Sequence, residues 1–280
     1  MNKEILIICR GGGDLATGIV HRLFRAGYQV LILETAEPAA IRRQVSFCEA
    51  VYEGTATVEG VTAERIYTAK KQAVEEVLQR GRIPLLVDPD GRSIEVLKPD
   101  VVVDAIIAKK NLGTYKEMAP LVIGIGPGFV AGKDVHLVVE SMRGHNLARI
   151  LETGSALANT GIPGNIGGYT KERVIHAAAE GYMKNLHQIG DVVRKGEEIA
   201  RIYEQMSPEG VFSGRFVSVE ATIPGVLRGL IREGYHFQKG FKIADIDPRE
   251  SELANCFTIS DKASSIGGSV LEAVCRYVNG

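Results

Sequence analysis

A glycine-rich turn between an apolar run and an amphipathic stretch constrains the fold more than any other feature of this chain. The run Ile5–Ile8 is followed by Gly11, Gly12 and Gly13, and helical periodicity begins directly after them. Gly11, Gly13 and Ala16 fit the G-x-G-x-x-G/A spacing of a dinucleotide-binding turn. Without side chains such a turn can close tightly, and backbone N–H groups at a helix N-terminus can then face a phosphate.

The residues expected to hold a phosphate-bearing ligand follow from this turn. Glu34 ends a second apolar run about 20 residues past the glycines, where a carboxylate can accept hydrogen bonds from a ribose 2′-OH. The alternative is a glycine turn of an α/β sheet that binds no ligand. The predicted ligand-binding set at this point is Gly11, Gly12, Gly13, Asp14, Leu15, Ala16 and Glu34.

The first half of the chain alternates between apolar runs and amphipathic segments. The runs are almost wholly apolar, which is typical of strands buried on both faces of a parallel sheet. In such sheets ligands bind at the carboxyl ends of the strands. The expected strands are Glu4–Cys9, Val30–Glu34, Pro84–Val87, Val101–Ile107, Leu121–Ile125 and Val135–Glu140, and the expected helices are Asp14–Ala26 and Ala69–Gln79.

Two loops that follow these strands carry charge or glycine. Lys109 and Lys110 follow the fourth strand, where they could neutralise a phosphate or form a solvated charge pair. Gly126 and Gly128 follow the fifth strand, where they could line the opposite wall of a ligand site or simply punctuate a turn.

The turn after the sixth strand contains the candidates for chemistry, Arg143 and His145, which offer an anion-binding group and an acid–base group. His145 could instead cap the helix that follows. No H-E-x-x-H, cysteine cluster or EF-hand spacing supports a metal site. Whether the chain catalyses a reaction stays open at this point.

The composition is that of a globular protein that binds neither nucleic acid nor a membrane. The 280 residues are 45% hydrophobic and 24% charged, with a formal net charge of −1. No block of like charges attracts nucleic acid, and no apolar run approaches the roughly 18 residues of a membrane span. We therefore expect a cytoplasmic protein. Its cysteines are expected to be reduced and structural, although Cys48 could be accessible; they are Cys9, Cys48, Cys256 and Cys275.

The C-terminal third contains an internal repeat. Eight residues between Ala177 and Ile202 recur 44 positions later along the chain. Each copy ends in G-x-x-x-x-K-G-x-x-I-A-x-I, whose alternating apolar residues predict short strands. One copy alone would leave strand edges unpaired, so we expect the two to interlock in one module. In that module Gly196 would match Gly240.

This repeat resembles the barrel-sandwich hybrid of biotinyl and lipoyl carrier domains. The connector from Tyr203 to Gly214 lacks the lysine that carries the prosthetic group in those domains, so we expect a structural or docking module. The expected fold class is α/β, with a Rossmann-like, mainly parallel sheet followed by an all-β barrel-sandwich hybrid. The expected domains are residues 1–170, residues 171–250, and a C-terminal segment 251–280 with a helix that packs on the rest.

Long motifs occur along nearly the whole chain: Arg10–Gly18, Ala40–Arg43 with Val45–Phe47, Gly124–Gly128, Arg143–His145, Lys242–Arg249, and Ile259–Lys262 with Ile266–Gly268. Together they resemble the YqeB family, which is described as accessory to selenium-dependent molybdenum hydroxylases, relatives of xanthine dehydrogenase. The N-terminal domain also has a distant resemblance to XdhC-type chaperones, which are thought to handle molybdenum cofactor.

The resemblance implies a maturation factor that binds a phosphate-bearing ligand, such as molybdopterin or its nucleotide form. It would present this ligand to the apo-enzyme of a molybdenum hydroxylase or to another accessory protein. One alternative is an NAD(P)-dependent oxidoreductase that supplies reducing equivalents, for which Glu34 favours NAD because a carboxylate repels a 2′-phosphate. The other is a scaffold protein with a vestigial nucleotide cleft. A homo-oligomer is compatible with each.

Overall fold

The computed structural model describes residues 5–161 and 164–280, which divide into two compact units. The first unit contains the chain up to Pro38 together with Val45–Thr160 and Ile259–Gly280. The second contains Ala39–Gln44 and Gly161–Thr258. The chain therefore enters the second unit twice.

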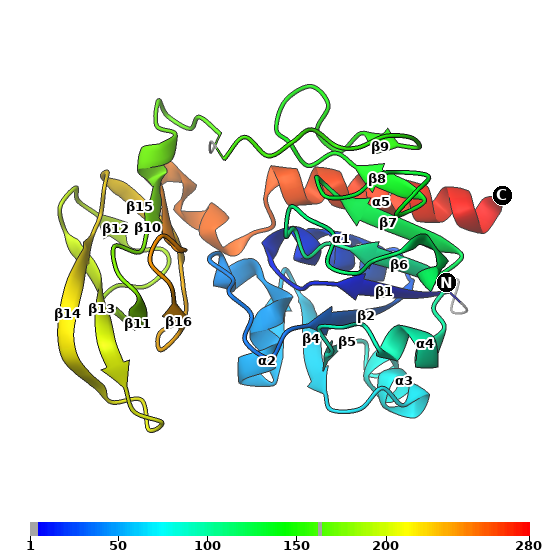
Figure 1. The fold of residues 1–280 in the computed structure, drawn as a ribbon, viewed down its shortest axis with the longest axis horizontal. Helices are drawn as coiled ribbons and strands as arrows, with labels where there is room; N and C mark the ends of the chain where they lie inside the picture. The colour runs from blue at the N-terminus through cyan, green and yellow to red at the C-terminus, as the bar shows by residue number, and fades with distance from the viewer. Residues whose placement is uncertain (1–4, 162–163) are drawn as a thin grey trace. The chain divides into compact units, whose positions relative to one another are not determined.

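The first unit is built on a nine-stranded sheet in the order β3-β4-β5-β2-β1-β6-β7-β8-β9 (Figure 1). Neighbouring strands from β4 through to β8 in this order are parallel, and the edge strands β3 and β9 are antiparallel to their neighbours. The bounds are β1 Leu6–Arg10, α1 Asp14–Arg25, β2 Gln29–Glu34, α2 Ala50–Glu53, β3 Thr55–Val58, β4 Val61–Ile66, α3 Lys71–Gln79, β5 Ile83–Val87, α4 Ser93–Leu97, β6 Val101–Asp104, β7 Leu121–Ile125, β8 Leu137–Val139, β9 Ile150–Leu151 and α5 Asp261–Asn279.

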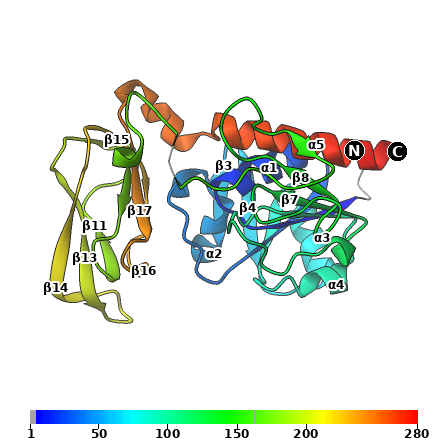
Figure 2. The same cartoon turned by 45° about the horizontal axis from the view of Figure 1, so that its top comes forward.

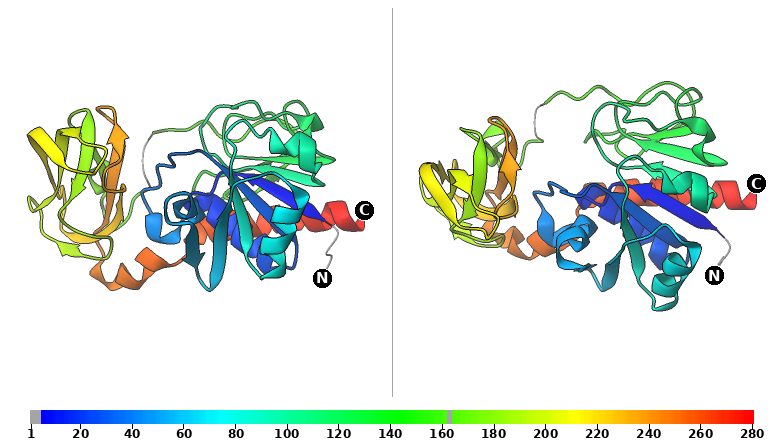
Figure 3. Two further views of the ribbon diagram at one scale, coloured as in Figure 1. Left: turned by 90° about the horizontal axis from the view of Figure 1, so that it is seen from below. Right: turned by 60° about the horizontal axis from the view of Figure 1, so that its bottom comes forward.

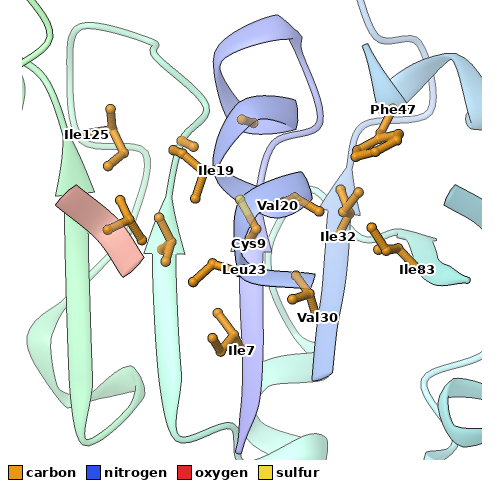
Figure 4. Close-up of a cluster of buried hydrophobic side chains, with 14 of the residues drawn as sticks. Ile7, Cys9, Ile19, Val20, Leu23, Val30, Ile32, Phe47, Ile83 and Ile125 are labelled. Atoms are coloured by element: carbon orange, nitrogen blue, oxygen red, sulfur yellow. The ribbon is translucent and has the colours of Figure 1, made fainter. Parts of the chain in front are cut away.

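Helices cover both faces of this sheet, because the central strands are apolar on both sides. Ile7 of β1 lies in one buried cluster with Ile19 of α1 (Figure 4). The C-terminal helix α5 packs against α1 on that face (Figures 2 and 3). Ile8, which points the other way, lies in a second cluster with Val74 of α3 and Ile94 of α4.

The expected strands are found in place, with changes at their ends. Leu121–Ile125 is β7 with the same bounds. The strand expected over Val101–Ile107 ends at Asp104, and Ile107 adopts a left-handed backbone conformation with φ 60°. The first strand begins at Leu6, and Glu4 lies outside the described residues. The β3–β4 hairpin is not among the expected strands, because β3 is short and largely exposed.

The second unit consists of two four-stranded antiparallel sheets rather than one closed barrel, in the orders β10-β17-β15-β12 and β14-β13-β11-β16. Each sheet takes one two-residue strand from the other copy of the repeat, because β12 pairs with β15 and β16 pairs with β11. The two copies therefore interlock. The bounds are β10 Val174–His176, β11 Gly181–Asn185, β12 Val192–Val193, β13 Glu198–Met206, β14 Phe212–Glu220, β15 Gly225–Leu230, β16 His236–Phe237 and β17 Lys242–Asp247.

Matched hydrogen bonds relate the two copies of the repeat. The Gly196 N–H donates to the Ala221 carbonyl at 2.8 Å, and the Gly240 N–H donates to the Ala177 carbonyl at 2.8 Å. Donors and acceptors in these two bonds are 44 residues apart along the sequence. The predicted match of Gly196 with Gly240 is confirmed.

Candidate functional site

The carboxyl ends of the parallel strands bring the predicted ligand-binding residues to one edge of the sheet. Gly11 directly follows β1, and its N–H donates to the Leu33 carbonyl of β2 at 2.8 Å. Gly11 has φ 100°, and a Cβ here would lie 2.9 Å from the Ala105 carbonyl oxygen after β6. Glycine at this position therefore lets three strand ends approach one another.

Glu34 binds the glycine turn itself. Its Oε2 accepts the Gly12 N–H at 2.7 Å, and its Oε1 accepts the Thr35 N–H at 2.8 Å. Burial raises the pKa of Glu34, and these hydrogen bonds act in the opposite direction. The Gly12 amide, which the sequence predicts to face a phosphate, is thus bonded to the chain's own carboxylate.

Gly13 is the residue of the turn that faces open space. It is the N-cap of α1, with φ −67°, and a Cβ built on it meets no atom within 4 Å. Asp14, Leu15 and Ala16 open the helix, where amides have no carbonyl acceptor within the same helix. Asp14 also places a carboxylate where it interacts favourably with the helix dipole. A ligand anion can approach the start of α1 on the open side of Gly13.

The loop after β6 is strained and packs against a glycine turn. Ile107 and Lys109 have φ 60° and 62°, values that are rare for residues other than glycine. A Cβ on Gly128, which has φ 117°, would lie 2.8 Å from the Cα of Lys110. Gly128 therefore accommodates protein backbone, whereas the sequence predicts that it lines a ligand. Lys109 and Lys110 are exposed on this loop.

A buried polar network that the motifs do not predict lies at the base of this loop. Arg10 and Asp104 end β1 and β6, and their Nη1 and Oδ2 atoms lie 3.6 Å apart. The Thr114 hydroxyl accepts a hydrogen bond from Arg10 and donates to Asp104 at 2.5 Å. Arg10 also donates to the carbonyls of Pro89 and Leu112, at 3.1 and 3.3 Å. Burial raises the pKa of Asp104, against the hydrogen bond from Thr114. The sequence does contain a signal for this network, because a charged residue ends each of the two apolar runs, Arg10 in β1 and Asp104 in β6.

Arg143 and His145 lie in the turn after β8, as the sequence predicts. Arg143 donates to both carboxylate oxygens of Asp261 in α5, at 2.7 and 3.0 Å, and this interaction raises the pKa of Arg143. His145 is exposed. A Cβ on Gly126 would collide with the hydroxyl of Ser141, which lies in this turn after β8, so Gly126 also contacts protein. In this arrangement Arg143 ties the turn to the start of α5.

Lys262 is a further charged residue at this edge. Burial lowers the pKa of Lys262, and Arg143 lowers it further, whereas Asp14, Glu140 and Asp261 oppose the change. The starts of α1 and α5 and the end of β8 thus share one electrostatic environment. Lys262 ends one of the sequence motifs, but its place in this environment was not predictable from the sequence.

The expectation that Cys48 could be accessible is wrong. Cys48 is 1% exposed, its N–H donates to the Gly12 carbonyl at 2.9 Å, and burial raises the pKa of its thiol. Cys9 is fully buried, as expected. Within residues 5–161 and 164–280 no group of three or more His, Cys, Asp or Glu side chains could hold a metal ion. No helix in this described part of the chain is long and apolar enough to cross a membrane.

These features define a mixed α/β protein with a parallel-rich sheet and a glycine turn at its strand ends. No family model matches the chain. The chain is 47% identical over 274 residues to the uncharacterized protein YqeB of Escherichia coli (strain K12). The match covers 98% of this chain and 48% of YqeB, so the chain spans about half the length of that relative. Similarity at this level supports the relationship to the YqeB family that the motifs indicate.

Solved structures with some similarity are remote. The product-bound ectoine utilization protein EutE (DoeB) from Ruegeria pomeroyi is 11% identical with a TM-score of 0.28, covering 87% of this chain and 85% of that chain. An aspartoacylase family protein from Mesorhizobium loti is 10% identical with a TM-score of 0.30, covering 88% of this chain and 85% of that chain. Similarities this low carry no conclusion about this protein.

Proposed function

We propose that this chain is an accessory protein for the maturation of a selenium-dependent molybdenum hydroxylase. In this proposal it binds a phosphate-bearing cofactor or nucleotide at the strand ends and presents it to the apo-hydroxylase or to another accessory protein. The maturation role rests on the motifs shared with the YqeB family. The binding role rests on the open space at Gly13, directly before the 12-residue helix α1.

The strand order supports a nucleotide-type ligand. Six of the seven parallel strands, β1, β2, β5, β6, β7 and β8, lie in the order 3-2-1-4-5-6 when numbered among themselves along the chain, which is the order of the Rossmann fold. The seventh, β4, lies outside them, next to β5. Such sheets bind dinucleotides where the strand order reverses, here between β1 and β6. We therefore infer that this sheet is Rossmann-like and that it binds its ligand where the strand order reverses.

The residues around the open side of Gly13 fit a phosphate. The amides that begin α1 supply donors without acceptors in the helix. Lys109 and Lys110 are exposed on the strained loop after β6, the strand next to β1, and in this proposal they add positive charge to this edge of the sheet. Molybdopterin would be cargo in this scheme, held by its phosphate and passed on.

The interlocked second unit has the docking role in this proposal. Its two copies exchange short strands, which is the arrangement expected of a barrel-sandwich hybrid. The β13–β14 connection contains no lysine, so a covalently attached carrier group has no attachment point there.

Native mass spectrometry of the full chain, purified from a host replete with molybdenum and selenium, tests the binding role. We expect a copurifying phosphate-bearing mass that is lost in Gly13→Val, because a side chain there enters the open space. The backbone at Gly13 permits valine, so Gly13→Val should remain folded, with a small loss of stability because valine is a poorer N-cap than glycine. Gly268→Ala, at another glycine with open space around its Cβ, is the matched control and should retain the mass.

Two outcomes would contradict the binding role. One is retention of the ligand by Gly13→Val. The other is a ligand-free parent protein that also gives no calorimetric signal with molybdopterin or nucleotides, a result that would favour the scaffold alternative.

The position of Glu34 at the end of β2 favours a second candidate, an NAD-dependent oxidoreductase. Glu34 would then accept a ribose hydroxyl through a lone pair that the amides of Gly12 and Thr35 leave unused. NAD should bind more tightly than NADP in a calorimetric titration. Binding of a pterin together with failure of both nicotinamide cofactors would rule this candidate out.

A further inference from the structure

A pocket lies in the first unit, between α1, the β3–β4 turn and the start of α5. Its volume is about 380 Å³. None of its lining residues belongs to the ligand-binding residues predicted at the carboxyl ends of the strands. The lining consists of Gly18, His21, Arg22, Arg25, Glu59, Ile259 and Ser264.

The close crossing of α1 and α5 shapes this pocket. A Cβ on Gly18 would lie 2.7 Å from the Cβ of Ala263, so the two helices touch at Gly18. This contact brings Ser264 of α5 within reach of α1, and Arg22 donates to the Ser264 hydroxyl at 2.6 Å. The pocket is therefore present before any ligand binds.

The lining has a surplus of positive charge. His21, Arg22 and Arg25 lie close together on α1, and Glu59 is the acidic residue of the lining. The Oε1 atom of Glu59 already accepts the Ile259 N–H at 2.8 Å. A concave site with this balance of charges attracts anions.

Arginines in the last turn of a helix also interact favourably with its dipole. That effect explains the basic end of α1. It does not explain why Ser264, from another helix, supplies a hydroxyl to Arg22 inside the pocket.

We propose that this pocket binds a small phosphorylated metabolite, with its phosphate on Arg22, Arg25 and His21. Guanidinium groups match phosphate oxygens in pairs of parallel hydrogen bonds. A volume of about 380 Å³ suits a small ligand. This site is separate from the strand-end site and does not depend on the ligand bound there.

Titration of the full chain with inorganic phosphate and with glycerol 3-phosphate tests the proposal, followed by calorimetry and by the NMR resonances of the His21 ring. We expect saturable shifts of His21 and at least tenfold weaker binding by Arg25→Gln. Arg25→Lys, which keeps the charge but not the paired donors, should fall between the two. The control Arg92→Gln removes an equal charge from a side chain that is 86% exposed and should bind as the parent does.

The proposal is overturned if His21 does not shift saturably, or if Arg25→Gln and Arg92→Gln weaken binding equally. Thermal unfolding of each variant shows whether it is folded. Gly13→Val should leave phosphate binding at this pocket unchanged, so failure here is distinguishable from failure of the strand-end site.

Discussion

Glu34 shows how a single side chain fixes the glycine turn. The fingerprint spacing predicts an acidic residue at this position, and the structure has it there. Its bond to the Gly12 amide joins residues 22 positions apart, and no sequence spacing predicts which amide a carboxylate will accept. The position was therefore predictable, but the partner was not.

Replacing this carboxylate should destabilise the protein. Glu34→Ala leaves the buried Gly12 amide without an acceptor, so we expect the free energy of unfolding to fall by about 1–3 kcal/mol. Glu95→Ala, at an exposed position of α4, should change it by less than about 0.5 kcal/mol. Urea denaturation at pH 7 measures both values, and equal losses would contradict the structural role of Glu34.

At the scale of elements, the packing of α5 on α1 is the contact that the sequence predicts least well. A helix is expected within residues 251–280, but its neighbour is more than 200 residues away along the chain. The helices meet through glycines, because a Cβ on Gly267 would lie 2.7 Å from the Gly18 carbonyl oxygen. Glycine pairs in separate motifs give no direct sign of such a contact.

Two adjacent glycines of α5 should respond oppositely to substitution. Gly267→Ala forces a methyl group against the α1 backbone and should destabilise the protein by about 1–3 kcal/mol. Gly268→Ala meets open space and should stabilise it by about 0.5–1 kcal/mol through helix propensity. Thermal and urea unfolding distinguish the two, and the same sign for both would show that the helices do not cross at this point.

The carboxylate of Asp88 accepts the amides of Arg92 and Ser93 at the start of α4 and so caps this helix. We therefore expect the stability of the protein to be sensitive to acid. Burial tends to raise the pKa of this carboxylate, but hydrogen bonds from Ser93 and Arg92 prevail, so the pKa of Asp88 is lowered from its usual 3.8. The stabilisation is therefore complete above pH 3.8 and is lost as the pH falls through the lower folded-state pKa.

Asp88→Ala should lower the free energy of unfolding by about 1 kcal/mol at pH 7. The difference from the parent should shrink in acid below the folded-state pKa of Asp88. Denaturation at a series of pH values gives this curve, and a difference that grows toward low pH would refute the capping role.

At the scale of the whole molecule, patterns repeated along the sequence were predictable and long-range pairs were not. The apolar runs predict a parallel sheet, and the repeat predicts the interlocking of the second unit. The segment Ala39–Gln44 joins that second unit through its bonds to Leu230, where Arg43 donates to the Leu230 carbonyl at 2.8 Å. The pairing of Arg10 with Asp104 likewise joins distant residues. Contacts of this kind depend on the folded arrangement rather than on local periodicity.

The central claim is that the start of α1 receives a phosphate on the open side of Gly13. Amide NMR of the full chain during titration with inorganic diphosphate tests it most directly, because each backbone N–H reports its own contact. We predict saturable shifts at Gly13, Asp14 and Leu15 that disappear in Gly13→Val. Saturable shifts confined to other residues, or persistence of the same shifts in Gly13→Val, would contradict the claim.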